Sequence, residues 1–124
     1  MKFIARRLFR FRHRGIPGIG RIARSLTKNE LMPSLKSRSN TGLNFYTNPA
    51  DAIDQIMLRT GKYEPHVLSA IQVNLQANDV FWDVGSNVGF HSISIRQLYP
   101  DISIYAFEPN PIIFSRLWAN ISLN

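Results

Sequence analysis

Residues 83–89, DVGSNVG, place a carboxylate, two glycines and an amide within a short stretch. Asp83 belongs to the apolar run VFWDV, which is typical of a strand buried on both faces of a parallel sheet. Gly85 permits a backbone conformation closed to other residues and leaves room for a ligand, and Gly89 lets the next helix begin close to the strand. Because ligands bind beyond the carboxyl ends of strands in open α/β sheets, this stretch predicts a binding loop.

The residue order in this loop differs from that of a dinucleotide-binding loop. The dinucleotide pattern is G-x-G-x-x-G with an acid about 20 residues further on. Here Asp83 precedes the first glycine, and Asn87 stands where the second glycine is expected. A carboxylate repels a diphosphate and attracts a cation. The loop therefore favours S-adenosylmethionine, which has an ammonium and a sulfonium group and no phosphate. Asn87 also suits a helix N-cap, either alone or as cap and ligand together.

The elements around the loop follow from the need for a crossover connection. Residues 102–108 predict a second strand that ends in Glu108, whose carboxylate can accept two hydrogen bonds from a ribose diol. Residues 91–96 alternate like a strand, but a helix is predicted there because two parallel strands need a crossover between them. Asn110 and Pro111 then predict the cap and first residue of another helix.

Structural roles compete with functional ones at several of these residues. Asp83 and Glu108 would be simple capping groups if they accepted only backbone amides. His91, in the first turn of the predicted helix, is a candidate general base, although a packed or solvent-facing histidine is commoner. Trp82 and Trp118 are expected in the core.

The segment before the loop predicts a strand and two helices. Alternation at 43–47 indicates a short strand. Asn48 as N-cap and Pro49 as first helical residue predict a helix that ends at Gly61. Pro65 predicts the start of a second helix, which leads into a turn before the loop-bearing strand.

Charge divides the chain near residue 41. Residues 1–40 contain eleven Lys and Arg residues against one acid, a formal charge of +10, whereas the remaining residues carry a formal charge of −3. The stretch KFIARRLFRFRHR at 2–14 has apolar and basic residues at helical spacing. We therefore expect a basic amphipathic arm over 1–41 and the folded part over 42–124.

Several roles suit this arm. It could be solvated, or pack on the folded part with its arginines outward. It could lie on an anionic membrane surface through residues 1–24, or serve as a transit peptide. Nucleic-acid binding is the weaker expectation because aromatic platforms do not alternate with the bases. No apolar run has the length of a membrane span, and no signal-peptide core is present, so we expect a cytoplasmic location, peripheral to a membrane if the arm binds one.

Motifs from both predicted strands carry a family resemblance. DVGSNVGFHSI, followed by IYAFEPNP and LWANISLN, resembles the FkbM family of S-adenosylmethionine-dependent methyltransferases, and RTGKYEP is similar to the segment that leads into this motif. The resemblance covers about residues 42–124. It implies an α/β class I methyltransferase fold with a Rossmann-like parallel sheet. It also implies methylation of a hydroxyl oxygen on a sugar or natural-product acceptor.

The resemblance assigns roles by position. The methionine end of the cofactor is lined by Asp83, Gly85, Ser86, Asn87 and Gly89. Glu108 holds the ribose, Pro109 and Asn110 lie near the adenine, and Glu64 approaches the site.

Only two strands of that seven-stranded fold are present, so the sequence is expected to be the N-terminal part of the domain, truncated after the second strand and its helix. A two-stranded parallel sheet leaves both edges open. No catalytic residue is assigned, because the base that a hydroxyl acceptor needs is expected in the absent part. The isolated chain is expected to bind S-adenosylmethionine weakly or not at all.

Two alternatives stay open. One is a nucleotide-binding oxidoreductase fragment that uses NAD. The other is a non-catalytic protein whose basic arm binds a membrane or nucleic acid. No metal site is expected, because the chain has no cysteine and its histidines, His13, His66 and His91, lack metal-ligand spacing.

Overall fold

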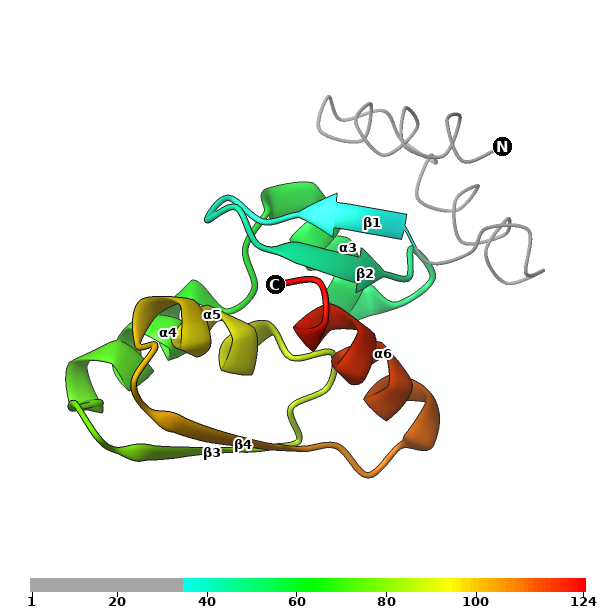
Figure 1. Cartoon of the computed structure of the whole chain (residues 1–124). Helices are drawn as coiled ribbons and strands as arrows, with labels where there is room; N and C mark the ends of the chain where they lie inside the picture. Colours follow the sequence, from blue (N-terminus) through cyan, green and yellow to red (C-terminus); the bar gives the residue numbers. More distant parts are fainter. Residues whose placement is uncertain (1–34) are drawn as a thin grey trace. The chain divides into compact units, whose positions relative to one another are not determined.

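Residues 35–124 are described by the computed structural model of the chain (Figure 1). They contain four strands and four helices and form an α/β structure. The chain divides into two compact units, with the division between Tyr63 and Glu64. The expectations for residues 1–34 of the basic arm, including a membrane-facing role for residues 1–24, lie outside the described residues.

The elements fall in this order. The first unit contributes β1 (Leu35–Arg38), β2 (Asn44–Thr47) and α3 (Ala52–Thr60). The second unit contains α4 (Pro65–Asn74), β3 (Val80–Val84), α5 (Phe90–Leu98), β4 (Ser103–Phe107) and α6 (Pro111–Ile121). The predicted binding loop joins β3 to α5 and therefore lies entirely within the second unit.

The first unit is built on an antiparallel hairpin of β1 and β2, with Leu35 opposite Thr47. Strand β2 confirms the alternation predicted at 43–47, whereas β1 was not predicted and precedes the expected boundary near residue 41. Leu35 and Phe45 are buried, and the Thr47 hydroxyl donates a hydrogen bond to the Leu35 carbonyl at 3.0 Å. Burial and this hydrogen bond hold β1 to β2.

Helix α3 begins three residues later than predicted, so the expected start at Asn48 and Pro49 is wrong. Asp51 is the N-cap, and its carboxylate accepts hydrogen bonds from two backbone N–H groups of the first turn, at 2.8 and 3.2 Å. The Asn48 side chain instead accepts from the backbone two residues further on, at 2.9 Å, as in an Asx turn. Gly61 ends the helix as predicted, with φ 69°.

In the second unit, β3 and β4 pair in parallel, with Val80 opposite Ser103 and Val84 opposite Phe107. Helix α5 connects them and packs against β4, which confirms the helix predicted over the strand-like segment 91–96. Helix α4 begins at Pro65 as predicted. The sequence of strand, loop, helix and strand therefore forms as the crossover argument requires.

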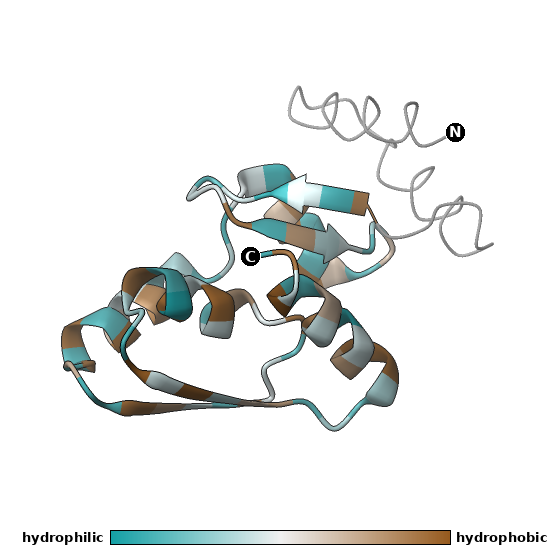
Figure 2. Cartoon of the chain, viewed as in Figure 1, coloured by the Kyte–Doolittle hydropathy of each residue, from teal (hydrophilic) through white to brown (hydrophobic). Residues whose placement is uncertain are grey.

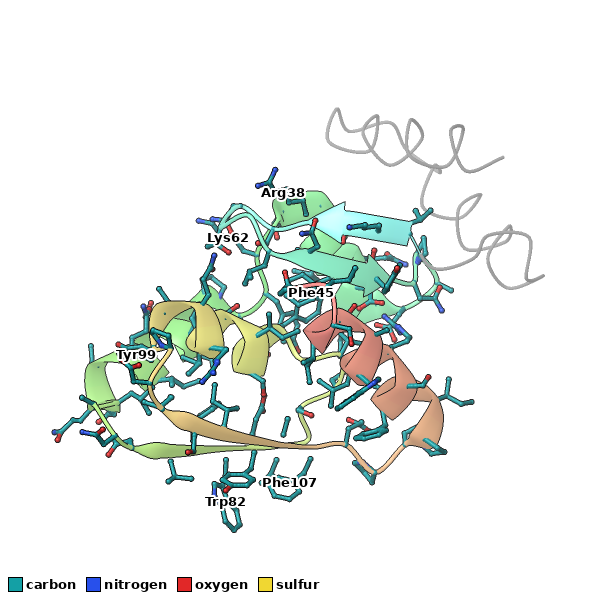
Figure 3. All side chains as sticks on the ribbon, viewed as in Figure 1. Arg38, Phe45, Lys62, Trp82, Tyr99 and Phe107 are labelled. Carbon is teal, nitrogen blue, oxygen red and sulfur yellow. The ribbon has the colours of Figure 1, made fainter. Side chains whose placement is uncertain are left out.

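The two faces of the β3–β4 sheet differ. Figure 1 shows α4 and α5 on one side of the two strands. Figure 2 shows hydrophobic residues along both strands, and Figure 3 shows Trp82 and Phe107 pointing to the side away from these helices. Strand β3 was predicted to be buried on both faces. Within residues 35–124 this prediction is wrong, because one face of the strand is exposed. The placement of Trp82 and Trp118 in the core is wrong too, because they are 63% and 65% exposed.

Candidate functional site

The loop after β3 turns sharply at three residues. Gly85, Asn87 and Gly89 have φ values of 81°, 49° and 88°, all in the left-handed region. Glycine adopts this region without strain, whereas other residues rarely enter it. The chain thereby turns from the strand into α5 within five residues, as the glycine spacing predicted.

The two glycines serve different purposes. A side chain at Gly85 would meet no described residue within 4 Å, apart from its neighbours in the chain. A Cβ atom at Gly89 would lie 2.6 Å from Cδ1 of Leu117 and 3.2 Å from Cδ1 of Ile93. Gly85 thus keeps space open at the end of the strand, as predicted. Gly89 allows close packing, but the close partners are on α6 and α5.

A hydrogen bond from α6 holds the loop in place, and it comes from a residue for which no role was predicted. Asn120 of α6 is fully buried, and its Nδ2 donates a hydrogen bond to the Val88 carbonyl at 2.9 Å. Val88 is also fully buried. The two residues are 32 positions apart, so no local pattern in the sequence predicts this bond.

The backbone amides of the loop are largely engaged by acceptors of the protein. The N–H groups of Gly85 and Ser86 both donate to the Phe107 carbonyl, each at 2.9 Å. The Asn87 N–H donates to Glu108 Oε2 at 3.0 Å, and the Gly89 N–H donates to the Ser86 carbonyl at 2.8 Å. A phosphate-binding loop needs such amides free to face its ligand. This loop offers few, which agrees with the expectation that its ligand has no diphosphate.

Asp83 lies at the end of β3 and points one carboxylate oxygen at α5. Its Oδ2 accepts hydrogen bonds from the Ser92 N–H at 3.2 Å and from the Ser92 hydroxyl at 2.5 Å. Within residues 35–124, no hydrogen bond reaches Oδ1. The capping role that competed with ligand binding therefore occupies one oxygen and leaves the other available.

The Glu108 carboxylate, after β4, accepts hydrogen bonds both from the loop after β3 and from the segment after β4. Its Oε2 accepts from the Asn87 N–H and its Oε1 accepts from the Asn110 N–H at 2.9 Å. A carboxylate oxygen has two lone-pair positions, so each oxygen can still accept a second hydrogen bond. Both donors are backbone amides, so within residues 35–124 Glu108 acts as the capping group that competed with the ribose-binding role, and it lies next to the binding loop.

Ser86 carries the clearest sign of a missing contact. The residue is 6% exposed, and its hydroxyl has no hydrogen-bond partner among the described residues. A buried hydroxyl without a partner is costly, so such a group calls for an explanation, such as a ligand or water. It lies in the loop, one residue after the open position at Gly85.

Asn87 is not the N-cap of α5, so both capping expectations for this residue, as a cap alone and as cap and ligand together, are wrong. Gly89 occupies the N-cap position. Asn87 instead takes the left-handed conformation within the loop. By contrast, Asn110 caps α6 as predicted, and its Oδ1 accepts from two N–H groups of the first turn, at 3.0 and 3.4 Å. Pro109 precedes it in an exposed position.

His91 and Glu64 lie together at the start of α5. Nε2 of His91 is 3.1 Å from Oε2 of Glu64, and the His91 side chain is only 17% exposed. Glu64 is the N-cap residue of α4, in a left-handed conformation with φ 41°, and its side chain makes no capping hydrogen bond to that helix. The structure therefore places Glu64 beside the end of the loop, and it makes His91 a packed, partnered residue.

Two kinds of feature are absent from the described residues. Residues 35–124 contain no cluster of three or more histidine, aspartate and glutamate side chains that could hold a metal ion. No helix within the same residues has the length and hydropathy needed to cross a membrane.

The residues at the carboxyl ends of β3 and β4 suit a diphosphate poorly. Among the described residues the buried Ser86 hydroxyl has no partner, and the position of a Cβ at Gly85 is open. Asp83 and Glu108 supply carboxylate acceptors for cationic and hydroxyl groups. The loop amides that a diphosphate would need are already engaged.

Comparison with known proteins finds methyltransferases. The chain is 39% identical over 51 residues to methyltransferase sdnD of Sordaria araneosa, which is 41% of this chain and 20% of that protein. It is 36% identical over 63 residues to the hexuronic acid methyltransferase AglP of Haloferax volcanii, covering 51% of this chain and 25% of AglP. It is 40% identical over 48 residues to the 31-O-demethyl-FK506 methyltransferase FkbM of Streptomyces tacrolimicus, covering 39% and 18%.

The matched segments thus span between 18% and 25% of the length of these relatives. No model of a protein family matches the chain. No solved structure matches it either. The similarity supports a methyltransferase-like function for this α/β chain, over matched segments that are a minor part of each relative.

Proposed function

We propose that this chain is part of an S-adenosylmethionine-dependent methyltransferase of the FkbM type, with a Rossmann-like sheet of which β3 and β4 are two strands. The observation that carries the proposal is that the three relatives named above are all methyltransferases. The site supports it independently. A loop whose buried Ser86 hydroxyl has no partner within residues 35–124 lies between two carboxylates at the carboxyl ends of parallel strands, where α/β folds bind ligands.

The residues have distinct roles in this proposal. S-adenosylmethionine, when bound, supplies a methyl group activated by the positive charge on sulfur. The Asp83 carboxylate attracts the cationic end, and Ser86 and Asn87 offer polar side chains to the methionine portion. Glu108 accepts hydrogen bonds from the ribose hydroxyls, and Gly85 leaves the ligand room to approach.

The acceptor is proposed to be a hydroxyl group on a small molecule or glycan. One relative bears a name that specifies an oxygen, a 31-O-demethyl-FK506 methyltransferase. Another is named a hexuronic acid methyltransferase, which supports a sugar acceptor with both hydroxyl and carboxyl groups. A hydroxyl acceptor needs a base to remove its proton, because a neutral alcohol is a poor nucleophile. No described residue is assigned this role.

Ligand-observed NMR on the 124-residue chain tests the cofactor directly, since saturation-transfer experiments detect millimolar binding. We expect signals from S-adenosylmethionine and S-adenosylhomocysteine, which are lost in the Asp83→Asn or Ser86→Val variants. NAD should give none. Saturation transfer to NAD with none to S-adenosylmethionine would replace this proposal with the oxidoreductase alternative.

A further inference from the structure

Positive charge is concentrated on one side of the division between the two units. Residues 1–63 contain thirteen Lys and Arg residues against three acids, a formal charge of +10. Residues 64–124, which form the second unit, contain two against five, a formal charge of −3. The candidate cofactor site belongs to the second unit, so it gives no reason for the cations that precede it. These cations call for a separate explanation.

One face of the β1–β2 hairpin carries part of this charge. Because side chains alternate along a strand, Lys36 and Arg38 of β1 share a face with their cross-strand partners Tyr46 and Asn44. We call these four residues the cationic face. Lys36 and Arg38 are exposed, and none of the four residues is an acid. The opposite face of the hairpin carries Phe45, which is buried. The hairpin therefore separates an apolar inner side from a basic outer side.

Two further cations lie near the turn of this hairpin. The Asn40 N–H donates a hydrogen bond to the Gly61 carbonyl at 3.0 Å, which joins the turn to the end of α3. Arg59 and Lys62 flank Gly61 in the sequence, and Figure 3 shows Arg38 and Lys62 at this end of the hairpin. Arg38, Arg59 and Lys62 are exposed, and none of them forms an ion pair with a described residue. The helix dipole accounts for a cation in the last turn of α3, such as Arg59, but not for the other two.

The two acids in the described part of the first unit have other roles. Asp51 caps α3 through hydrogen bonds from backbone N–H groups. Asp54 is 1% exposed and accepts a hydrogen bond from the Asn48 N–H at 2.6 Å. Neither carboxylate neutralises the three exposed cations named above. These cations are therefore available to an anion from outside the chain.

The sequence before the hairpin indicates the kind of anion. The stretch KFIARRLFRFRHR at 2–14 combines arginines with Ile4, Leu8 and Phe11 at helical spacing. A membrane surface takes up both the apolar and the basic residues of such a pattern, whereas nucleic-acid phosphates take up only the cations. Tyr46 is the one aromatic residue of the cationic face, so this face offers no series of stacking platforms for bases. An anionic lipid surface therefore fits better than a nucleic acid.

We propose that residues 1–63 bind the surface of an anionic phospholipid membrane. The apolar residues of the 2–14 stretch enter the interface, and the basic residues of the cationic face, together with Arg59 and Lys62, contact lipid phosphates. This inference goes beyond the proposed function and does not depend on it, because the candidate cofactor residues all belong to the second unit.

Vesicle sedimentation with the full 124-residue chain tests the proposal. The probes are vesicles of phosphatidylglycerol and phosphatidylcholine in equal parts, and vesicles of phosphatidylcholine alone. We expect the chain to sediment with the mixed vesicles, and the bound fraction should fall as the salt concentration rises, because salt screens the attraction. Little binding is expected to phosphatidylcholine alone. Equal binding to both kinds of vesicle, or binding to neither, would overturn the proposal.

Two arginines provide matched variants. Arg38 and Arg96 are both exposed, and each donates a hydrogen bond to a backbone carbonyl, that of Gly42 at 3.0 Å and that of Ile102 at 3.1 Å. Arg38→Glu should weaken binding to the mixed vesicles by about fivefold or more, whereas Arg96→Glu in the second unit should weaken it by less than about twofold. Lys62→Glu should also weaken binding, and its side chain has no hydrogen bond to a described residue that the change would break. Equal effects of Arg38→Glu and Arg96→Glu would show that only the net charge matters, and would overturn the assignment of this surface.

Leu8→Ser distinguishes a membrane from a nucleic acid. It removes an apolar side chain from the 2–14 stretch without a change in charge, so it should weaken vesicle binding by about tenfold. Binding to a double-stranded DNA oligonucleotide should stay unchanged. Unweakened vesicle binding by this variant would overturn the proposal. Tighter binding of the unaltered chain to the oligonucleotide than to the vesicles, at the same salt concentration, would replace the membrane with nucleic acid as the partner. S-adenosylmethionine binding, measured separately, decides the proposed function in every case.

Discussion

The two ends of the loop after β3 have the same backbone geometry and opposite surroundings. Gly85 and Gly89 both have φ values above 80°, yet the first faces open space and the second packs against Leu117. The second end is also fixed by the buried hydrogen bond from Asn120 to Val88. The difference teaches that one end anchors the loop to the fold, whereas the other leaves groups available for a ligand.

The largest effect should come from Gly89→Ala. The new methyl group would lie 2.6 Å from the buried Leu117 side chain, and the alanine would have to adopt an unfavourable φ of 88°. We expect the free energy of unfolding to fall by about 2–4 kcal/mol. Urea denaturation followed by circular dichroism measures this, and a loss no larger than that of Gly85→Ala would contradict the anchoring role.

Asn120→Ala should come next. It removes the donor that satisfies the Val88 carbonyl and leaves a gap in a fully buried position. The expected loss is about 2 kcal/mol in the same denaturation experiment. Asn74→Ala is the control, because Asn74 makes its hydrogen bond to Ala70 on the exposed surface of α4. If the two variants lost equal stability, the buried bond would not be an anchor.

Gly85→Ala should lower the stability less than the two variants above, but it should weaken ligand binding. No described atom would clash with the added methyl, so only the unfavourable φ of 81° contributes, at about 1–2 kcal/mol. The methyl would nevertheless project into the space proposed for the ligand. Saturation-transfer signals from S-adenosylmethionine should therefore disappear at temperatures where the variant is folded, and unchanged signals would argue against a ligand there.

Ser86→Ala should be the least destabilising of these changes. Its hydroxyl is buried without a partner among the described residues, so its removal should not lower the free energy of unfolding and should raise it by up to about 1 kcal/mol. Ser92→Ala is the contrast, since Ser92 donates its hydroxyl to Asp83 and should lose about 1 kcal/mol. A loss for Ser86→Ala as large as for Ser92→Ala would show that the Ser86 hydroxyl has a structural partner.

Local chemistry explains what could be predicted from the sequence. The crossover around the loop followed from glycine spacing and from the need to join parallel strands. The end of α3 at Gly61 and the start of α6 at Asn110 could be predicted from the capping residues. The start of α3 was misplaced because Asn48 and Asp51 are both good caps, and only the hydrogen bonds decide between them.

Long-range contacts explain what could not be predicted. Strand β1 is defined by pairing with β2 and by burial of Leu35, and neither is visible in four residues of sequence. The bond from Asn120 to Val88 joins distant positions. The exposure of Trp82 depends on which elements are present to cover the sheet. The assignments of Asp83 and Glu108 as cofactor ligands stay predictions.

The most direct test of the open end of the loop is a residue-resolved NMR titration of the ¹⁵N-labelled 124-residue chain with S-adenosylmethionine. The account predicts saturable shifts, at millimolar concentrations, of the amide signals of Gly85, Ser86 and Asn87. Smaller shifts are expected at Gly89. Shifts confined to other parts of the chain, or no shifts where NAD moves these same signals, would contradict it.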